Sequence, residues 1–253
     1  MELTNILKRK GIKFEKINDK LLINADCLEV LRYIPHRSID LIFTDPPYDL
    51  NDVNLTPLTG VQKDKVSKEF RRVLKQSGNV AIMAGKLCKW EWYNKLTKYG
   101  FKLHSEFIWI HSNPPQFAIP LKNKRSFVWS HDTILCFRLS NNNYFNTNEL
   151  VTNPKEAVDW IKHPTLIGIL RGSEDGVPVE KINTTPRPQK VARRIIKFMM
   201  PKGGVLLDPF MGTGTFVAYT DDRAIGIEKN PDIFDIAVDR VRNLSKQKKL
   251  EIW

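Results

Sequence analysis

The sequence predicts an α/β fold in which buried parallel strands alternate with helices. Two short apolar runs, 21–25 (LLINA) and 39–44 (IDLIFT), flank a segment whose apolar residues recur at helical spacing. A second pair, 205–208 (VLLD) and 224–228 (AIGIE), flanks a glycine-rich turn and a short helical segment. Strands that are apolar throughout are typical of a parallel sheet covered by helices on both faces.

The first half of the chain supplies further elements of this sheet. Residues 62–75 predict an amphipathic helix that stops at Ser77-Gly78, and 79–84 (NVAIMA) predict another buried strand. Residues 89–100 predict a helix whose last residue, a glycine, serves as its C-cap.

The later elements include a change of strand direction. Residues 107–111 and 133–139 alternate enough to predict strands, which we expect to be antiparallel at one edge of the sheet. A helix follows over 189–199. The last predicted helix starts at Pro231 and runs to about Ser245, because proline is favoured in the first turn and an apolar stripe follows it.

The domain organisation follows from a change in composition near residue 140. A length of 253 residues fits one α/β domain with an inserted subdomain. The segment 141–184 is polar and rich in turn-forming residues, which predicts an insertion rather than a linker. Residues 1–140 and 185–253 would then form the catalytic domain.

The charge balance favours a polyanionic partner. Lys and Arg number 40 against 28 Asp and Glu, a formal net charge of +12, and each phosphate neutralised by such a cation releases a condensed counterion. The three cysteines are too few and too scattered for a disulfide frame or a metal site. The sequence shows no signal-peptide pattern and no apolar run near 18 residues. We therefore expect a cytoplasmic protein that has no metal and no membrane partner.

The tetrapeptide Asp45-Pro46-Pro47-Tyr48 directly follows the strand 39–44, where open α/β sheets bind their ligands. The exocyclic amino group of a nucleic-acid base is a poor nucleophile. A carboxylate and the first proline's carbonyl can accept its two N–H donors and stabilise the charge that develops on nitrogen. The second proline stiffens the turn, and the tyrosine offers a flat face for an extruded base. The motif therefore predicts a site that activates such an amino group.

A second motif, 208–215 (DPFMGTGT), lies between a strand and a helix. Gly212 and Gly214 would let the backbone turn sharply and approach a ligand that faces the helix N-terminus. Glu228 ends the next strand, where nucleoside-binding sheets place a carboxylate for ribose hydroxyls. Val217 stands where a dinucleotide fingerprint has its third glycine. The pattern therefore favours a nucleoside ligand without a pyrophosphate.

Together these two motifs resemble the amino-methyltransferases of bacterial restriction–modification systems. The order, with the tetrapeptide first and the glycine-rich loop near the C-terminus, resembles the permuted β class. The segments NADCLEVL at 24–31, HSNPPQ at 111–116, SHDTILCF at 130–137 and TPRP at 185–188 resemble further family segments, over most of the chain. The resemblance implies a Rossmann-like, circularly permuted methyltransferase fold, with a mixed sheet that has an antiparallel edge.

The resemblance also implies S-adenosyl-L-methionine as the cofactor, with Asp45, Pro46, Pro47 and Tyr48 as the catalytic residues. The residues implied to bind the cofactor are Asp26, Cys27, Arg187, Pro188, Asp208, Pro209, Phe210, Gly212, Gly214, Thr215 and Glu228. One departure is that Arg187 stands where the family usually has Lys. The separate His-Pro-Thr at 163–165 lies too far from the helix at 189–199 to be the family segment that we place at 185–188, directly before this helix.

Other side chains leave two readings open or weigh toward structure. Lys122, Lys124 and Arg125 lie between the two segments implied beside the base pocket, where phosphate contact and a solvated loop are equally supported. Trp90 and Trp92 sit in a helical pattern, which favours the core over a base-stacking platform. The basic run 246–249 (KQKK) predicts a solvated helix end.

The function expected from this resemblance is site-specific methylation of the N6 amino group of adenine in duplex DNA, by base flipping. The aspartate before Pro-Pro-Tyr favours adenine over the alternative, N4-cytosine. An RNA adenine methyltransferase is a second alternative, opposed by the motif order. A DNA-binding protein on a degenerate scaffold is a third, opposed by the intact tetrapeptide and glycines. The insertion would read the target sequence. A homodimer and a cognate restriction endonuclease are partners raised by the resemblance alone.

Overall fold

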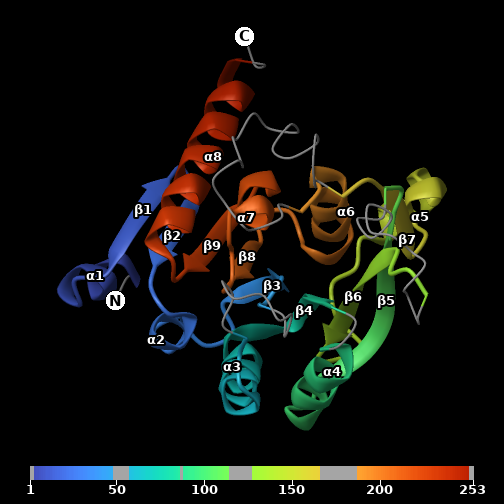
Figure 1. The fold of residues 1–253 in the computed structure, drawn as a ribbon, viewed down its shortest axis with the longest axis horizontal. Helices are drawn as coiled ribbons and strands as arrows, with labels where there is room; N and C mark the ends of the chain where they lie inside the picture. Colours follow the sequence, from blue (N-terminus) through green and yellow to red (C-terminus); the bar gives the residue numbers. More distant parts are fainter. Residues whose placement is uncertain (1–2, 48–56, 86–87, 114–126, 166–186, 251–253) are drawn as a thin grey trace.

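The computed structural model describes residues 3–47, 57–85, 88–113, 127–165 and 187–250. These residues form one sheet with helices on both of its faces (Figure 1). The strands are β1 (Lys13–Ile17), β2 (Lys20–Asn24), β3 (Ile39–Thr44), β4 (Leu74–Ala84), β5 (Lys102–His111), β6 (His131–Arg138), β7 (Trp160–His163), β8 (Val205–Asp208) and β9 (Arg223–Glu228).

The strand order is β1-β2-β9-β8-β3-β4-β6-β5-β7. The five strands from β2 to β4 in this order are mutually parallel. β1 is antiparallel to β2, and β6 is antiparallel to both β4 and β5. The predicted α/β fold with a mixed sheet is confirmed. The two strands expected to be antiparallel, β5 and β6, do pair in that way, although β7 lies beyond β5 as the edge strand.

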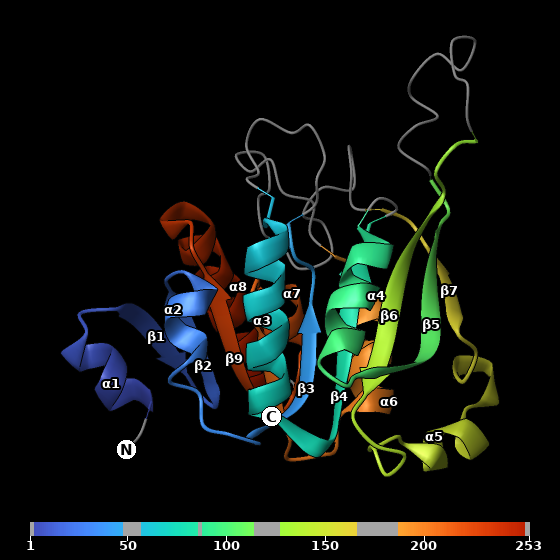
Figure 2. The same ribbon diagram turned by 90° about the horizontal axis from the view of Figure 1, so that it is seen from below.

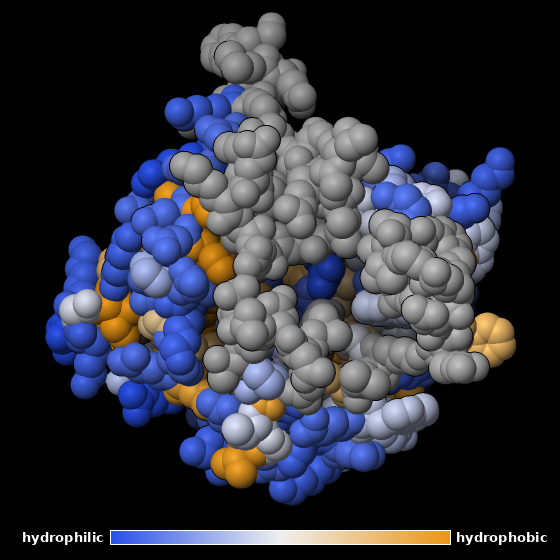
Figure 3. All heavy atoms as spheres, viewed as in Figure 1, coloured by the Kyte–Doolittle hydropathy of each residue, from blue (hydrophilic) through white to orange (hydrophobic). Residues whose placement is uncertain are grey.

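The helices form two layers. They are α1 (Leu3–Arg9), α2 (Cys27–Leu31), α3 (Gly60–Val73), α4 (Lys89–Lys98), α5 (Thr147–Thr152), the 3-10 helix η3 (Pro154–Glu156), α6 (Gln189–Met199), α7 (Thr215–Tyr219) and α8 (Pro231–Leu250). α2, α3 and α4 lie on one face of the sheet, whereas α6, α7 and α8 lie on the other (Figures 1 and 2). Where described residues form the surface seen in Figure 3, it is mainly hydrophilic.

The strand β3 shows why this sheet lies at the centre of the molecule. All six of its residues are buried, and because successive side chains point to opposite faces, the strand feeds two separate cores. Leu41 and Phe43 join the cluster under α6, α7 and α8, where Phe43 stacks on Phe216 with ring centroids 3.7 Å apart. Ile42 joins the cluster that contains Phe70 of α3. Sequence and burial therefore agree on a central strand.

The boundary between α3 and β4 differs from the prediction. The helix expected over 62–75 gives way to the strand at Leu74, whose backbone is extended (φ −72°, ψ 135°). Ser77 and Gly78 lie inside β4. A Cβ on Gly78 would lie 2.9 Å from the carbonyl oxygen of Asp40. This glycine therefore allows a close backbone approach. The helix ends where Leu74 pairs with Ile39 of β3.

Other boundaries were predicted with mixed success. α4 ends near Gly100, whose φ of +82° confirms it as a capping glycine. α8 runs to Leu250, past the end predicted near Ser245, and α1 and β1 had no counterpart in the prediction. Of the predicted insertion, the described part, 141–165, forms α5, η3 and β7. In the described part of the chain, no helix is long and apolar enough to span a membrane.

Candidate active site

The predicted catalytic motif and the glycine-rich motif begin at the carboxyl ends of two paired strands. β3 and β8 are parallel neighbours, with Leu41 opposite Leu206. At the ends of these strands, the Thr44 hydroxyl donates a 2.7 Å hydrogen bond to Oδ1 of Asp208. Asp45 follows Thr44 directly. Segments that are 164 residues apart in the chain are thereby joined at one edge of the sheet.

Asp45 is held by an arginine from a distant segment. Its Oδ2 accepts a hydrogen bond of 2.5 Å from Nε of Arg187, and the side chains are 16% and 17% exposed respectively. Arg187 precedes Pro188, the buried N-cap of α6. Pro46 is buried and Pro47 half-buried beside this pair, whereas Tyr48 lies outside the described residues. A residue predicted to border the cofactor therefore contacts the predicted catalytic carboxylate.

Asp208 is buried, and burial is the main influence on its protonation state. Its side chain accepts hydrogen bonds from the Thr44 hydroxyl and from the backbone N–H of Phe210. Burial above all, together with the neighbouring charges of Asp45 and Glu228, nonetheless raises the pKa of Asp208 to about 8. The site thus contains a carboxyl group that is largely protonated at neutral pH.

The glycine-rich loop, residues 208–215, has the conformation that its glycines predict. Gly212 and Gly214 have φ of +50° and +81°, in the left-handed region that favours glycine. Gly214 is also the N-cap of α7, and a Cβ there would lie 3.0 Å from the Cβ of Ala237 on α8. Thr215 is buried at the start of α7, as is Pro209 within the loop.

Glu228, at the end of β9, accepts one hydrogen bond from this loop and one from the residues that follow the strand. Its Oε2 accepts from the backbone N–H of Gly212 at 3.0 Å, and its Oε1 accepts from the backbone N–H of Asn230 at 2.7 Å. Burial raises the pKa of Glu228, while these backbone hydrogen bonds lower it. The carboxylate predicted for ribose hydroxyls therefore also fixes the loop.

Asp26 and Cys27 follow β2, the parallel neighbour of β9. Asp26 is the N-cap of α2, and its Oδ1 accepts from the backbone N–H of Leu28 at 2.9 Å. The Lys229 ammonium lies 3.5 Å from Oδ2 of Asp26. Cys27 is buried, which raises the pKa of its thiol. The described cofactor candidates thus lie at the carboxyl ends of β2, β8 and β9 and at the start of α6.

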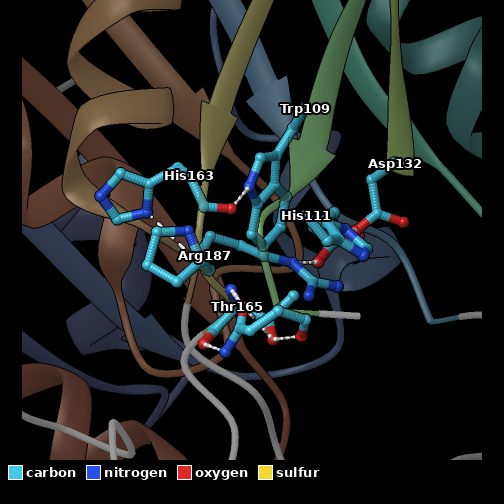
Figure 4. Close-up of polar contacts among 9 residues, drawn as sticks. Trp109, His111, Asp132, His163, Thr165 and Arg187 are labelled. Carbon is cyan, nitrogen blue, oxygen red and sulfur yellow. Dashed lines mark hydrogen bonds and ion pairs between the residues drawn. The ribbon is translucent and has the colours of Figure 1, made fainter. Parts of the chain in front are cut away.

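A polar and aromatic cluster beside this site was missed by the residue-by-residue prediction. His111, at the end of β5, pairs through Nε2 with Oδ2 of Asp132 at 3.1 Å, and both side chains are buried. The Trp109 indole N–H donates to the carbonyl of His163 at 2.9 Å. Figure 4 shows this cluster together with Arg187. The sequence indicated this cluster only through the family segments at 111–116 and 130–137. The parallel pairing of β7 with β5, which brings His163 into the cluster, has no local sequence pattern.

The 163–165 segment, set aside in the sequence as a decoy for the helix motif, has a different place. Asn113 follows β5, and its Oδ1 accepts from the backbone N–H of Thr165 at 2.6 Å. Its Nδ2 donates to the carbonyl of Thr165 at 3.2 Å. These bonds extend the β5–β7 pairing beyond the strand ends, so the segment belongs to the sheet edge rather than to the start of α6.

The prediction that both Trp90 and Trp92 lie in the core is wrong for Trp90. Trp92 is fully buried as expected, but Trp90 is 65% exposed, because it lies on the opposite side of α4. Trp90, Phe127 and Trp129 line a cavity of about 450 Å³ near Ala84, at the end of β4. The basic residues Lys122, Lys124 and Arg125, predicted for phosphate contact, lie outside the described residues.

Comparisons with known proteins identify the family of the chain. A family model described as DNA methylase (N6_N4_Mtase) matches residues 39–239. The chain is 28% identical over 263 residues to the type II methyltransferase M.HinfI of Haemophilus influenzae, covering 91% of this chain and 71% of that protein. Its fold is similar to PvuII DNA methyltransferase (cytosine-N4-specific), with a TM-score of 0.72 at 19% identity over 95% of each chain. It is also similar to an M1.HpyAVI–SAM complex, with a TM-score of 0.64 at 19% identity over 87% of this chain and 98% of that one. Since the family match spans most of the sequence, the chain belongs to the N6/N4 DNA methylase family.

Proposed function

We propose that this chain transfers a methyl group from S-adenosyl-L-methionine to the N6 amino group of adenine at specific sites in duplex DNA. One observation carries the proposal. The end of β3, with Asp45, lies beside the glycine-rich loop after β8, and the Thr44–Asp208 hydrogen bond joins them. A methyl donor on the loop would therefore be adjacent to the carboxylate that orients the amino group.

The residues at this edge fit the proposed cofactor. A Cβ on Gly212 would meet no atom of the described residues within 4 Å, so none of these residues crowds the loop backbone at this point. Acidic side chains at the ends of β2 and β9 suit ribose hydroxyls and a cationic ligand. We propose that the cofactor is held by the set predicted from the sequence: Asp26, Cys27, Arg187, Pro188, Asp208, Pro209, Phe210, Gly212, Gly214, Thr215 and Glu228. S-adenosyl-L-methionine supplies a methyl group already activated on a sulfonium, so the chain has mainly to position the reactants.

The predicted catalytic residues act on the target base. The Asp45 carboxylate and the Pro46 carbonyl accept the two N–H donors of the amino group and stabilise the positive charge that develops on nitrogen. Pro47 keeps the turn rigid. Tyr48 stacks on the extruded base. This mechanism works by charge stabilisation and orientation more than by prior removal of a proton.

The DNA-binding part of the proposal rests on charge and on family membership. We propose that Lys122, Lys124 and Arg125 contact backbone phosphates and that the insertion 141–184 reads the sequence. The motif order supports a permuted β-class enzyme, and the aspartate at position 45 supports adenine as the target. Action in the cytoplasm, a homodimer and a cognate restriction endonuclease follow from the same family type as further proposals.

The target base can be determined in one experiment. The chain is expressed in a methylation-free bacterial host together with a plasmid, and the recovered plasmid is sequenced for modified bases. We expect N6-methyladenine in one sequence context. N4-methylcytosine would overturn the adenine proposal, and tritiated methyl transfer to structured RNA but not to duplex DNA would overturn the DNA substrate.

The role of the catalytic carboxylate has a separate test. Asp45→Ala removes the proposed acceptor for the amino N–H, so we expect methyl transfer to be lost while the Kd for S-adenosyl-L-methionine, measured by calorimetry, stays close to that of the unsubstituted chain. Full methylation by this variant would contradict the mechanism.

A further inference from the structure

Arg187 connects two rigid parts of the molecule at the point where chemistry is proposed. Its side chain contacts Asp45, which directly follows the buried central strand β3. On its own side, Arg187 is followed by the buried Pro188, whose carbonyl accepts from the backbone N–H of Ala192 in the first turn of α6. α6 is in turn packed into the core. The pair is therefore a fixed bridge between elements 142 residues apart.

The surroundings of this pair are acidic. Asp208 is buried, and the charge of Asp45 raises its pKa, which shows that the two carboxyl groups interact. Glu228 raises the pKa of Asp208 as well. Burial and these like charges favour the protonated form of Asp208, whereas an adjacent guanidinium favours the charged form of a carboxyl group. Arg187 is placed to supply that positive charge to Asp45.

The contact with Arg187 also constrains the direction in which the Asp45 carboxylate points. Nε of Arg187 lies 2.5 Å from Oδ2 of Asp45, and both side chains are about five-sixths buried. The planar guanidinium has donors in a fixed fork, so it sets the orientation of a carboxylate more strictly than an ammonium does. An ionised carboxylate has about four acceptor positions. Pairing with Arg187 is therefore compatible with accepting an N–H donor from a base.

We infer that Arg187 is a positioning residue for methyl transfer: through its ion pair it holds the Asp45 carboxylate in the orientation that faces the amino group. This inference rests on the proposed function and adds to it. The backbone of the Arg187-Pro188 segment can border the cofactor while the side chain serves Asp45.

The test separates catalysis from cofactor binding. Arg187→Gln removes the charge, Arg187→Lys retains it with a different geometry, and Arg194→Gln removes a charge from α6 where the arginine bonds the carbonyl of Glu156 instead. Two quantities are measured for each variant. They are the single-turnover rate of methyl transfer to duplex DNA at saturating S-adenosyl-L-methionine, and the Kd of that cofactor by calorimetry.

We expect Arg187→Gln to lower the rate by roughly tenfold to a hundredfold, less than the roughly hundredfold to thousandfold loss on removing a donor that itself contacts the transition state, because Arg187 acts through Asp45. Its cofactor Kd should change by less than about threefold. Arg187→Lys should recover part of the rate, and Arg194→Gln should match the unsubstituted chain in both quantities.

Two results would overturn the inference. A weaker cofactor Kd with an unchanged rate at saturation would make Arg187 a cofactor ligand, and no change in either quantity would make the ion pair incidental. If thermal melting shows that Arg187→Gln does not fold, Arg187→Lys decides: a lower rate at unchanged Kd supports the inference, and an unchanged rate refutes it. Absence of methyl transfer by the unsubstituted chain would instead refute the proposed function itself.

Discussion

Asp208 lies where the two motifs meet, and its environment gives it a pKa of about 8 against an ordinary value of 3.8. The folded chain therefore holds this carboxyl group protonated over a pH range in which the unfolded chain ionises it. A group with a raised pKa in the folded state contributes stability that is complete below the ordinary value. That stability is lost as the pH rises toward the folded-state value.

This relation gives the first prediction. The contribution of Asp208 to the free energy of unfolding should fall between about pH 4 and pH 8, and Asp208→Asn should remove this fall, because asparagine cannot ionise. Urea unfolding at a series of pH values measures it. Asp239→Asn, on the exposed side of α8, is the matched control and should keep the original slope. Equal slopes for all three proteins would contradict the raised pKa.

At the residue scale, the sequence placed Asp45 correctly but not its partner. The apolar run 39–44 predicts a buried strand, and a buried parallel strand puts the next residue at the ligand edge of the sheet. The contact with Arg187 depends on how the start of α6 crosses the end of β3. No local period encodes such a crossing. Trp90 was misplaced for a related reason: a helical pattern identifies α4, but not which of two tryptophans faces the core.

Among the elements, α7 and α8 hold the glycine-rich loop from two sides. Gly214 starts α7 in a left-handed conformation, against Ala237 of α8. Gly203, in the turn before β8, has a similar φ of +77°, but a Cβ there would meet no atom of the described residues within 4 Å. The two glycines therefore share backbone strain and differ in crowding, which makes them a matched pair.

The second prediction uses this pair. Gly203→Ala should cost about 1–2 kcal/mol of unfolding free energy from the left-handed backbone alone, with no change in cofactor Kd. Gly214→Ala should cost more, because Ala237 must also move, and it should weaken cofactor binding. Denaturant unfolding and calorimetry measure the two effects. Equal losses of stability with intact binding in both variants would show that the Gly214 contact is unimportant.

The side chain of Arg240 on α8 also contacts the glycine-rich loop. It is 2% exposed, and its Nη1 donates to the carbonyl and hydroxyl of Thr213 and to the hydroxyl of Thr215, at 2.8–2.9 Å. Sequence patterns did not reveal it, because an arginine on a charged terminal helix is usually solvated. The structure instead makes it an internal support for the loop.

The third prediction concerns this support. Arg240→Met should reduce the free energy of unfolding by about 3 kcal/mol or more, since buried oxygens lose a charged donor. It should also weaken cofactor binding by loosening the loop. Arg242→Met, on the same helix, removes a half-exposed ion pair with Glu15 and should cost at most about 1 kcal/mol. Similar denaturation midpoints for the two variants would argue against a supporting role.

For the whole molecule, fold class was more predictable than edges and boundaries. Apolar strands, helical spacing and the glycine-rich turn identified the parallel centre, since each is a local signal. β1 and β7 lie at the two edges of the sheet, where the residues are half exposed and their patterns weak. The change from α3 to β4 at Leu74 was obscured because Val73 and Leu74 continue the helical spacing of Val66 and Phe70, and the first residues of β4 after Leu74 are polar. Long-range pairing decided what local patterns left open.

The net charge of +12 supports the last prediction, which concerns DNA affinity. The logarithm of the binding constant for duplex DNA should fall linearly with the logarithm of salt concentration, by about 0.9 per phosphate contacted. Replacing Lys122, Lys124 and Arg125 together by Gln should reduce that slope by about two to three, with cofactor Kd unchanged. Replacing Lys246, Lys248 and Lys249, predicted to be a solvated helix end, removes the same charge and should leave the slope nearly intact. Fluorescence anisotropy measures the binding constant at salt concentrations between about 50 and 200 mM. Equal slopes for the two triple variants would show that the 122–125 segment makes no specific phosphate contacts.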